Sequence, residues 1–295
     1  MTKPLEVSPL DYHSRLKCHR DDIRREDSYL SKSVLWELRE ASLYRWRYFP
    51  KKFAGSDAAD WGSVLDCLVT TPSEIPNILA VHDFPDFRTK EAREFRDAAK
   101  ADGKICWNQG RLDDCQLAAD RLMSHKEAAR VIESSRRQVV ALGTVSDVQF
   151  KGLLDLAPDT GGILYDIKTT GRLSAREMSS RIDGLGYHVQ AALYLHLFNQ
   201  AYGDDRKKFR LIWQENTPPY EIAITEIPAF DIEAGRDWIT HQTRRLITAT
   251  ERNHWPMIFD GETVLLGRPD YASFRDDEEL DGFPAAPTKS EPITA

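Results

Sequence analysis

The chain has 295 residues, of which 41% are hydrophobic and 10% aromatic, a composition typical of a folded protein with one large domain or two small ones. No run approaches the roughly 18 apolar residues of a membrane helix, and the amino terminus has no apolar core resembling a signal peptide, so we expect a cytoplasmic protein with no membrane attachment. Residues 260–295 contribute −6 to the net charge of −7, which leaves the rest of the chain near −1.

The amino-terminal part is expected to be helical. Residues 1–30 form an irregular or partly helical lead-in. Apolar residues at helical spacing predict a helix that begins near Ser31 and ends before Pro50. Further along, a short helix is expected over "DAADWGSVLDCLVT", a loop over residues 76–85, and helices over residues 89–101 and 109–134.

From Arg137 the period of the sequence changes to that of strands. Three of them, "QVVALGT", "VQFKGLLDLA" and "GILYDIKTT", form a predicted meander. A capping box at Ser174 begins a helical region, which Gly184 and Gly186 divide in two. Two more strands, "FRLIWQE" and "YEIAITEI", and a long helix from about residue 229 to 253 complete the pattern.

This order of elements predicts an α/β (α+β) fold with a central mixed sheet flanked by helices and an N-terminal helical extension. We expect one domain over residues 31–259, with a helical part at 31–135 and a core at 136–259. The acidic, proline-containing tail at 260–295 is expected to be loosely ordered.

A basic stretch runs from Arg39 to Lys52 and has a local charge of +4 interleaved with aromatic residues. It could follow a phosphate backbone, or it could be the solvated face of an amphipathic helix. The four cysteines form no C-x-x-C pair and are expected to be free thiols; they are Cys18, Cys67, Cys106 and Cys115.

Charged residues interrupt the apolar strands of the meander. Asp166 and Lys168 share one face of their strand because side chains alternate, and Asp155 lies on the preceding strand, where pairing can bring it beside Asp166. Two such carboxylates repel each other unless a cation joins them or one takes a proton. Mg²⁺ or Mn²⁺ prefers oxygen ligands of this type, and with the adjacent Lys168 ammonium the set suits metal-assisted attack of water on a phosphate. The triplet alone could also be an ordinary surface ion pair.

A polar stripe follows on the next helix. Tyr187, Gln190 and Tyr194 stand at i, i+3 and i+7, on one side of the helix. The stripe could lie over a metal site, or it could be the polar edge of a helix whose Tyr194 packs in the core.

The whole series resembles the PD-(D/E)xK nuclease superfamily: Asp155, then Asp166-Ile167-Lys168-Thr169-Thr170, then Tyr187-x-x-Gln190-x-x-x-Tyr194. Within it, the series is similar to the branch with a Q-x-x-x-Y motif, which contains the RecB-type nuclease domains. The stretches "YLSKSVLWELREASLYRWRYF" and "AADWGSVLDCLVTTPSE" resemble the RecE-like exonucleases (exodeoxyribonuclease VIII) of phages and prophages. The resemblance spans roughly residues 29 to 202.

The resemblance implies a restriction-endonuclease-like fold and a role for each matching position. Asp155 and Asp166 would bind Mg²⁺ or Mn²⁺ by their side chains and Ile167 by its backbone carbonyl. Lys168 would orient or activate the attacking water. Gln190 and Tyr194 would position the site or touch the DNA backbone.

The resemblance also implies a substrate and partners. Such enzymes digest linear double-stranded DNA from its ends during recombination, so DNA ends, a single-strand annealing recombination protein and a homo-oligomer are the implied partners. Iron–sulfur relatives need cysteines after the Gln-Tyr helix, and this chain has none beyond Cys115, so no iron–sulfur cluster is expected.

Two positions depart from the family pattern. Members usually have His where this chain has Asp66, which could serve as an oxygen ligand or could be a solvent-facing helix residue. They usually have Glu where this chain has Gln138, whose neutral amide would weaken the grip on a second cation; Glu133 would replace it in a different register. The leading hypothesis is therefore a metal-dependent DNA exonuclease. The alternatives are a nuclease-fold DNA-binding or interaction module without catalysis, and a hydrolase or interaction protein unrelated to DNA.

Overall fold

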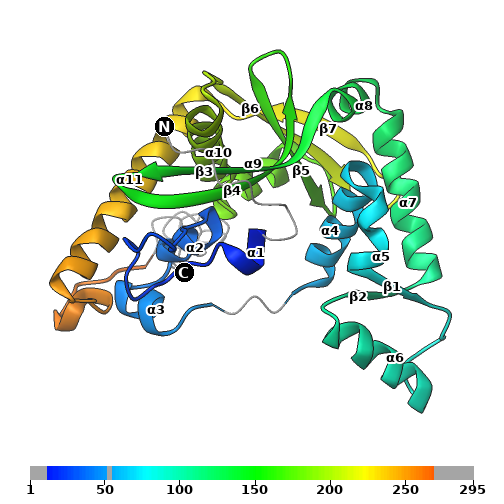
Figure 1. Cartoon of the computed structure of the whole chain (residues 1–295), viewed down its shortest axis with the longest axis horizontal. Helices are drawn as coiled ribbons and strands as arrows, with labels where there is room; N and C mark the ends of the chain where they lie inside the picture. Colours follow the sequence, from blue (N-terminus) through cyan, green and yellow to red (C-terminus); the bar gives the residue numbers. More distant parts are fainter. Residues whose placement is uncertain (1–11, 52–54, 269–295) are drawn as a thin grey trace, which may run out of the picture. The chain divides into compact units, whose positions relative to one another are not determined.

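The computed structural model describes residues 12–51 and 55–268. The chain as far as Pro256 forms one compact unit, in which helices flank a five-stranded sheet (Figure 1). The second unit begins at Met257, and its described part contains a short 3₁₀ helix, η3, at Ile258–Gly261. Most of the predicted acidic tail, residues 269–295, lies outside the described residues. None of the described helices is long and apolar enough to cross a bilayer.

The central sheet is mixed and has the strand order β3-β4-β5-β6-β7. β5 and β6 are parallel, whereas the other neighbours are antiparallel. The meander of β3, β4 and β5 is thus confirmed, as is the predicted α/β class. The strands are β3 Ser135–Val145, β4 Val148–Pro158, β5 Ile163–Thr170, β6 Lys208–Glu215 and β7 Ile222–Glu226.

Helices cover both faces of this sheet (Figure 1). One face packs against α10 and α11, around buried residues such as Phe198 and Trp213. The other packs against α4, α7 and α8, around Leu122 and Ile212. The helices are α4 Asp57–Thr70, α7 Gln109–Ser124, α8 Lys126–Glu133, α9 Ala175–Gly184, α10 Tyr187–Tyr202 and α11 Ala229–Arg252.

In both β3 and β4, the alternation of side chains between the two faces of the sheet shifts by one residue at one point. On β4, Leu154 and Ala157 both pack on the α10 side although they are three residues apart. Leu156, which regular alternation would place on the same face as Leu154, packs on the α4 side. β3 does the same: Val139 packs on the α10 side, and so does Arg136, whose guanidinium lies 5.2 Å from the Phe198 ring. The shift occurs at Gln138 in β3 and at Asp155 in β4. These two residues lie opposite each other, between the registered pairs Arg137–Leu156 and Val139–Leu154. Strict alternation therefore fails at the two positions of interest.

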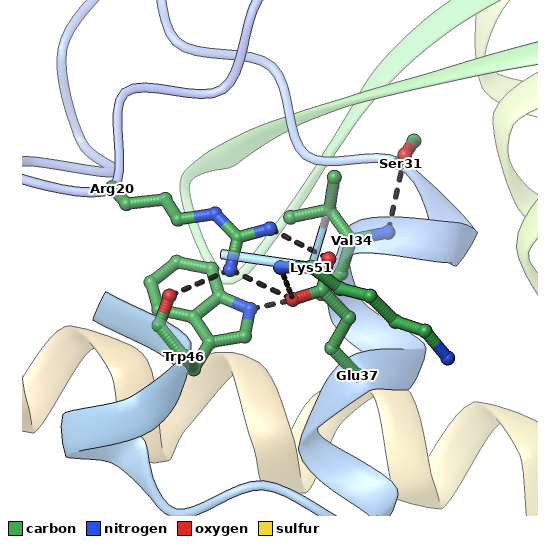
Figure 2. Close-up of polar contacts among 6 residues, drawn as sticks. All are labelled: Arg20, Ser31, Val34, Glu37, Trp46 and Lys51. Carbon is green, nitrogen blue, oxygen red and sulfur yellow. Dashed lines mark hydrogen bonds and ion pairs between the residues drawn. The ribbon is translucent and has the colours of Figure 1, made fainter. Parts of the chain in front are cut away.

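The helix predicted from Ser31 is broken into α2, η1 and α3 (Figure 2). The prediction of one continuous helix was wrong, because α2 passes into the 3₁₀ helix η1 at Glu37 and Ser42 begins a new helix. The Glu37 carboxylate accepts two bonds from Arg20, of 3.0 and 2.7 Å, and Ser42 Oγ caps a new helix by accepting from Arg45 N at 3.1 Å. Arg20 also donates to the Trp46 carbonyl at 2.6 Å, which ties the lead-in to this region. The elements are α1 Tyr12–Arg15, α2 Lys32–Trp36, η1 Glu37–Arg39 and α3 Leu43–Tyr48.

A second, smaller sheet was missed in the sequence. β1 lies within residues 76–85, which were expected to be a loop, and it pairs in parallel with β2, which lies between the helices expected over 89–101 and 109–134. Four-residue strands give too short a pattern for periodicity to reveal them. The helix expected over 109–134 is also divided, because His125 caps α8 through its ring nitrogen. The remaining elements are η2 Pro72–Glu74, α5 Ile75–Ile78, β1 Leu79–His82, α6 Lys90–Ala101 and β2 Ile105–Asn108.

Candidate active site

Asp166 and Lys168 project from the same face of β5 and are buried together. The Lys168 ammonium contacts Oδ2 of Asp166, and the side chains are 18% and 2% exposed. A second Asp-x-Lys triplet, Asp205-Arg206-Lys207, shows what the surface alternative looks like. Its ion pair measures 3.1 Å and its side chains are about four-fifths exposed, at 77% for Lys207 and 82% for Asp205. The triplet on β5 is therefore no ordinary surface pair.

Asp155 reaches β5 through its side chain. β4 and β5 are registered at Leu156 and Tyr165, and next to that pair Asp155 Oδ2 accepts a hydrogen bond of 2.9 Å from the backbone N–H of Ile167. The carboxylate thus takes the place of a backbone ladder bond, because the phase change turns Asp155 away from both faces. This contact holds Asp155 next to Asp166. The Ile167 side chain itself packs in the cluster on the α4 side.

Asp66 comes to the site from α4. This helix packs closely on β5, since a Cβ at Gly62 would lie 3.3 Å from Thr169 Oγ1. Asp66 Oδ2 accepts a hydrogen bond of 2.6 Å from Gln138 Nε2, and Asp66 Oδ1 is sealed from solvent. Asp66 is thus no solvent-facing residue, although the sequence allowed that interpretation.

Gln138 and not Glu133 joins the site from the first strand. Gln138 has a positive φ of 50°, a backbone conformation that is uncommon outside glycine and costs of order 1 kcal/mol or more. The strained turn aims its amide at Asp66. Glu133 is exposed at the end of α8.

α10 supplies Gln190 and Tyr194. Gln190 Nε2 donates a hydrogen bond of 2.8 Å to Asp166 Oδ1. The Tyr194 ring lies over Gly152, where a Cβ would come within 3.1 Å of it, and burial raises the pKa of its hydroxyl. The close packing suits a residue that positions Gln190 better than one that contacts a large substrate.

Two further residues reach the same place: Tyr187, which the sequence pattern placed in the polar stripe, and Lys32, which it did not single out. The Lys168 ammonium lies 4.7 Å from the centre of the Tyr187 ring, and the Lys32 ammonium lies 5.9 Å from it. Lys32 donates to the carbonyl of Leu185, just before α10 begins. Only the contact of α2 with this segment brings Lys32 near, and no local sequence signal could have identified it.

Burial and crowding of like charges govern the electrostatics of the site. Burial raises the pKa of Asp66 to about 7, with a further contribution from the charge of Asp166. Burial, and then the charges of Asp166 and Asp66, raise the pKa of Asp155 well above its ordinary value. Burial alone would lower the pKa of Lys168, but Asp166, Tyr187 and Asp155 raise it above its ordinary value. Burial and the Lys168 charge lower the pKa of Lys32 to about 7.

The donor groups fit a hard divalent cation, although they are not preassembled around one. Among the residues that the structure describes, no three Asp, Glu, His or Cys side chains stand in a metal-binding cluster. Asp66 Oδ1, however, is buried without a hydrogen-bond partner among those residues, and the carboxyls of Asp66, Asp155 and Asp166 repel one another. A divalent cation that prefers oxygen ligands would give Asp66 Oδ1 a partner and would reduce the repulsion among the three carboxyls. All four cysteines are free and would contribute nothing to such a site.

Comparison with known proteins gives the family and the fold. Residues 80–262 match the family described as "PDDEXK-like domain of unknown function (DUF3799)". A crystal structure of a "putative exonuclease" from Eubacterium rectale aligns with a TM-score of 0.58 and 13% identity, over 92% of this chain and 98% of that one. A phage related exonuclease from Haemophilus somnus aligns with a TM-score of 0.36 and 10% identity, over 83% of this chain and 96% of that one, too weakly to support an argument. None of the curated proteins matches this chain.

Proposed function

Because this chain belongs to the PDDEXK-like family represented by that domain of unknown function, we propose that it is a metal-dependent nuclease that hydrolyses phosphodiester bonds. The predicted superfamily and its restriction-endonuclease-like fold are confirmed, whereas the RecE-like branch stays a prediction. The finer proposal is an exonuclease that acts on the ends of linear double-stranded DNA.

One observation carries the proposal: carboxylates from two neighbouring strands meet beside a buried ammonium. Asp155 bonds to the backbone of Ile167, and its neighbour Asp166 contacts Lys168. Phosphodiester hydrolysis needs charge neutralisation around the phosphate and an activated water, and this set of groups can supply both.

In the proposed mechanism, Asp155 and Asp166 would hold Mg²⁺ or Mn²⁺, with the Ile167 carbonyl and Asp66 as further oxygen donors. Such an ion acts as a Lewis acid and makes water a better nucleophile at neutral pH. Lys168 orients the water and stabilises the negative charge that develops on the phosphate oxygens. Gln190 keeps the Asp166 carboxylate in a fixed orientation.

Paired substitutions in the two Asp-x-Lys triplets test this function. The double variant Asp166→Asn, Lys168→Met removes both buried charges, so that no unpaired charge is left behind. We expect it to lose digestion of linear duplex DNA in Mg²⁺ and Mn²⁺ by at least about 100-fold. The control, Asp205→Asn with Lys207→Met, makes the same changes in the exposed triplet and should digest DNA like the parent.

The substrate arm uses linear, nicked-circular and closed-circular duplexes of one sequence. Digestion of the linear form alone supports an exonuclease, and cutting of closed circles contradicts that part of the proposal. Equal digestion by the two double variants would refute the assignment of the site.

A second function, a nuclease-fold nucleic-acid-binding module without catalysis, is favoured by one contact. The neutral Gln138 amide occupies Asp66 Oδ2, in the place where a family member would have a carboxylate. Titration of the protein with Mg²⁺ and Mn²⁺ by calorimetry separates the two functions. DNA binding without metal binding or cleavage would favour the module.

A further inference from the structure

A basic hollow lies on the carboxyl-terminal half of α11, formed by residues that play no part in the candidate active site. Its volume is about 380 Å³, and none of the residues that line it is acidic. Those residues are Leu43, His241, Arg244, Arg245, Thr248, Ala249, Arg252, His254 and Pro256.

The arginines of the hollow form a stripe along one side of α11. Arg244, Thr248 and Arg252 are spaced by one helical turn each, and Arg245 stands beside them. The side chains of Arg244 and Arg252 are exposed, and neither makes an ion pair or hydrogen bond with another residue of the described ranges 12–51 and 55–268. The neighbouring acid, Glu251, is engaged at 2.6 Å by Arg24. The stripe therefore keeps its positive charge.

Stabilisation of the helix end explains only part of this pattern. Cations near the carboxyl terminus of a helix favour its dipole, but the effect falls off within the last turn. Arg252 is the last residue of α11, so its positive charge interacts favourably with the helix dipole. Arg244 and Arg245 stand two turns earlier, where the dipole gives them no such benefit. Arg245 donates to the neutral Gln242 amide at 2.7 Å, and neither arginine makes an ion pair with another described residue, so their charges point to an external anion.

The basic stretch of α3 adjoins the hollow. Tyr44 N donates to the Pro256 carbonyl at 3.0 Å, and Trp46 stacks on Trp255 with ring centres 6.1 Å apart. Arg47 lies 5.5 Å from the Trp255 ring, and its buried Nε has no hydrogen-bond partner among the described residues. Arg47 of α3 therefore adds a further positive charge beside the hollow on α11.

We propose that this surface, the Arg244–Arg252 stripe with the adjoining α3, binds the phosphate backbone of a nucleic acid at a second place on the protein. Guanidinium groups suit phosphate because they donate two parallel hydrogen bonds. The span from His241 to Arg252 is about 16 Å at 1.5 Å per residue. That equals about five base pairs of duplex at 3.4 Å each, enough to meet several successive phosphates. The choice of a nucleic acid over other polyanions rests on the proposed nuclease function.

The test measures binding of a short fluorescein-labelled DNA duplex by anisotropy, in EDTA so that no cleavage occurs. The variant is Arg244→Ala with Arg252→Ala. Each lost phosphate contact lowers the slope of log Kd against log salt concentration by about 0.9, so we expect the slope to fall by about 1.8 and the affinity to weaken at low salt. Arg244→Lys with Arg252→Lys keeps both charges and should keep the slope.

The matched control is Arg93→Ala with Arg121→Ala, which removes two exposed arginines from α6 and α7. A thermal melt of each variant confirms that it is folded. The proposal is overturned if the Arg244, Arg252 variant binds DNA with the parent's affinity and slope, or if the control loses as much. It is also overturned if the stripe variant loses binding to phosphatidylglycerol vesicles but not to DNA.

The outcome can be separated from that of the nuclease proposal. Binding in EDTA reports on the stripe even if the protein cleaves nothing. Cleavage of the small diester bis(p-nitrophenyl) phosphate reports on the Asp155–Asp166 site, and the stripe variant should retain the parent's rate because so small a substrate cannot reach both places.

Discussion

Gln190 Nε2 donates a hydrogen bond of 2.8 Å to Asp166 Oδ1, while the Lys168 ammonium contacts the other oxygen of the same carboxylate. Both oxygens of Asp166 therefore have a partner, one from α10 and one from its own strand. Such partners fix the orientation of a carboxylate before any ligand arrives. Of the Q-x-x-x-Y motif, Gln190 is thus the residue that contacts Asp166 directly.

Substitution of Gln190 should affect catalysis more than substitution of a comparable glutamine on the same helix. Gln190→Ala leaves Asp166 Oδ1 without its donor, which costs about 1–3 kcal/mol of stability. Loss of an orienting partner should also lower cleavage about 10- to 100-fold. The control is Gln200→Ala, since Gln200 accepts from Thr144 N at 2.7 Å, away from the site. It should lose stability but keep the parent's cleavage rate, and a Gln190→Ala enzyme with full activity would contradict the role given to Gln190.

Asp155→Asn should stabilise the metal-free protein while it abolishes activity. The asparagine oxygen can still accept from Ile167 N–H, but the variant has no carboxylate whose charge would be destabilised by burial and by Asp166 and Asp66. We expect the melting temperature in EDTA to rise by a few degrees, given that ~1 kcal/mol corresponds to about 2–4 °C in a domain of this size. The gain should grow as pH rises above about 4, the ordinary pKa of an aspartate, because the unfolded parent then releases a proton that the folded carboxyl retains. A variant that melts lower than the parent at every pH would show that Asp155 is not strained by its charge.

Asp66 should make stability depend on pH in a defined window. Its pKa is raised from 3.8 to about 7, so between these values the folded state holds a proton that the unfolded state has released. The contribution of this group to stability therefore falls as pH rises through the window and levels off above about 7. Denaturant unfolding of the parent and of Asp66→Asn in EDTA, compared from pH 4 to 8, measures it. The parent should lose stability relative to the variant across that range, and a constant difference would argue against the assigned shift.

Gln138→Glu should make metal binding tighter at the cost of the metal-free state. A carboxylate in place of the amide would face Asp66 Oδ2, now 2.6 Å from Gln138 Nε2. Two facing carboxylates repel without a cation and bind one more tightly. We expect a lower melting temperature in EDTA, a lower Kd for Mg²⁺ by calorimetry and faster cleavage. Gln116→Glu, in an exposed Gln–Asp hydrogen bond of 2.9 Å on α7, should change none of these metal properties. Unchanged Mg²⁺ affinity in Gln138→Glu would exclude Gln138 from the site.

Part of the site followed from the sequence because it is local. Alternation along one strand is enough to put Asp166 and Lys168 on one face, and helical spacing is enough to put Gln190 and Tyr194 on one side. The central sheet and the two helices divided at Gly184 and Gly186 were likewise predictable from period and from turn residues.

The remaining features depend on contacts between distant segments. Alternation gives no hint that Asp155 leaves both faces of the sheet to bond with Ile167 N–H. The sequence does not determine whether Asp66 faces solvent, because that depends on how α4 packs on β5 at Gly62. Lys32 reaches Leu185 only because α2 contacts the segment before α10. The contact between Arg20 and Glu37, near the break in the helix after Ser31, likewise joins segments that are far apart in the sequence.

Gln138 in β3 and Asp155 in β4, at which the alternation of side chains shifts, constrain where relatives of this chain can gain or lose residues in these strands. Deletion of Gln138 alone would turn Arg136 and the residues before it to the opposite face, while the facing half of β4 stayed as it is. Removal of Asp155 alone would do the converse. Insertions and deletions in this hairpin should therefore occur as matched pairs across the two strands, and an alignment with a gap in one strand only would misplace the site in every relative it covers.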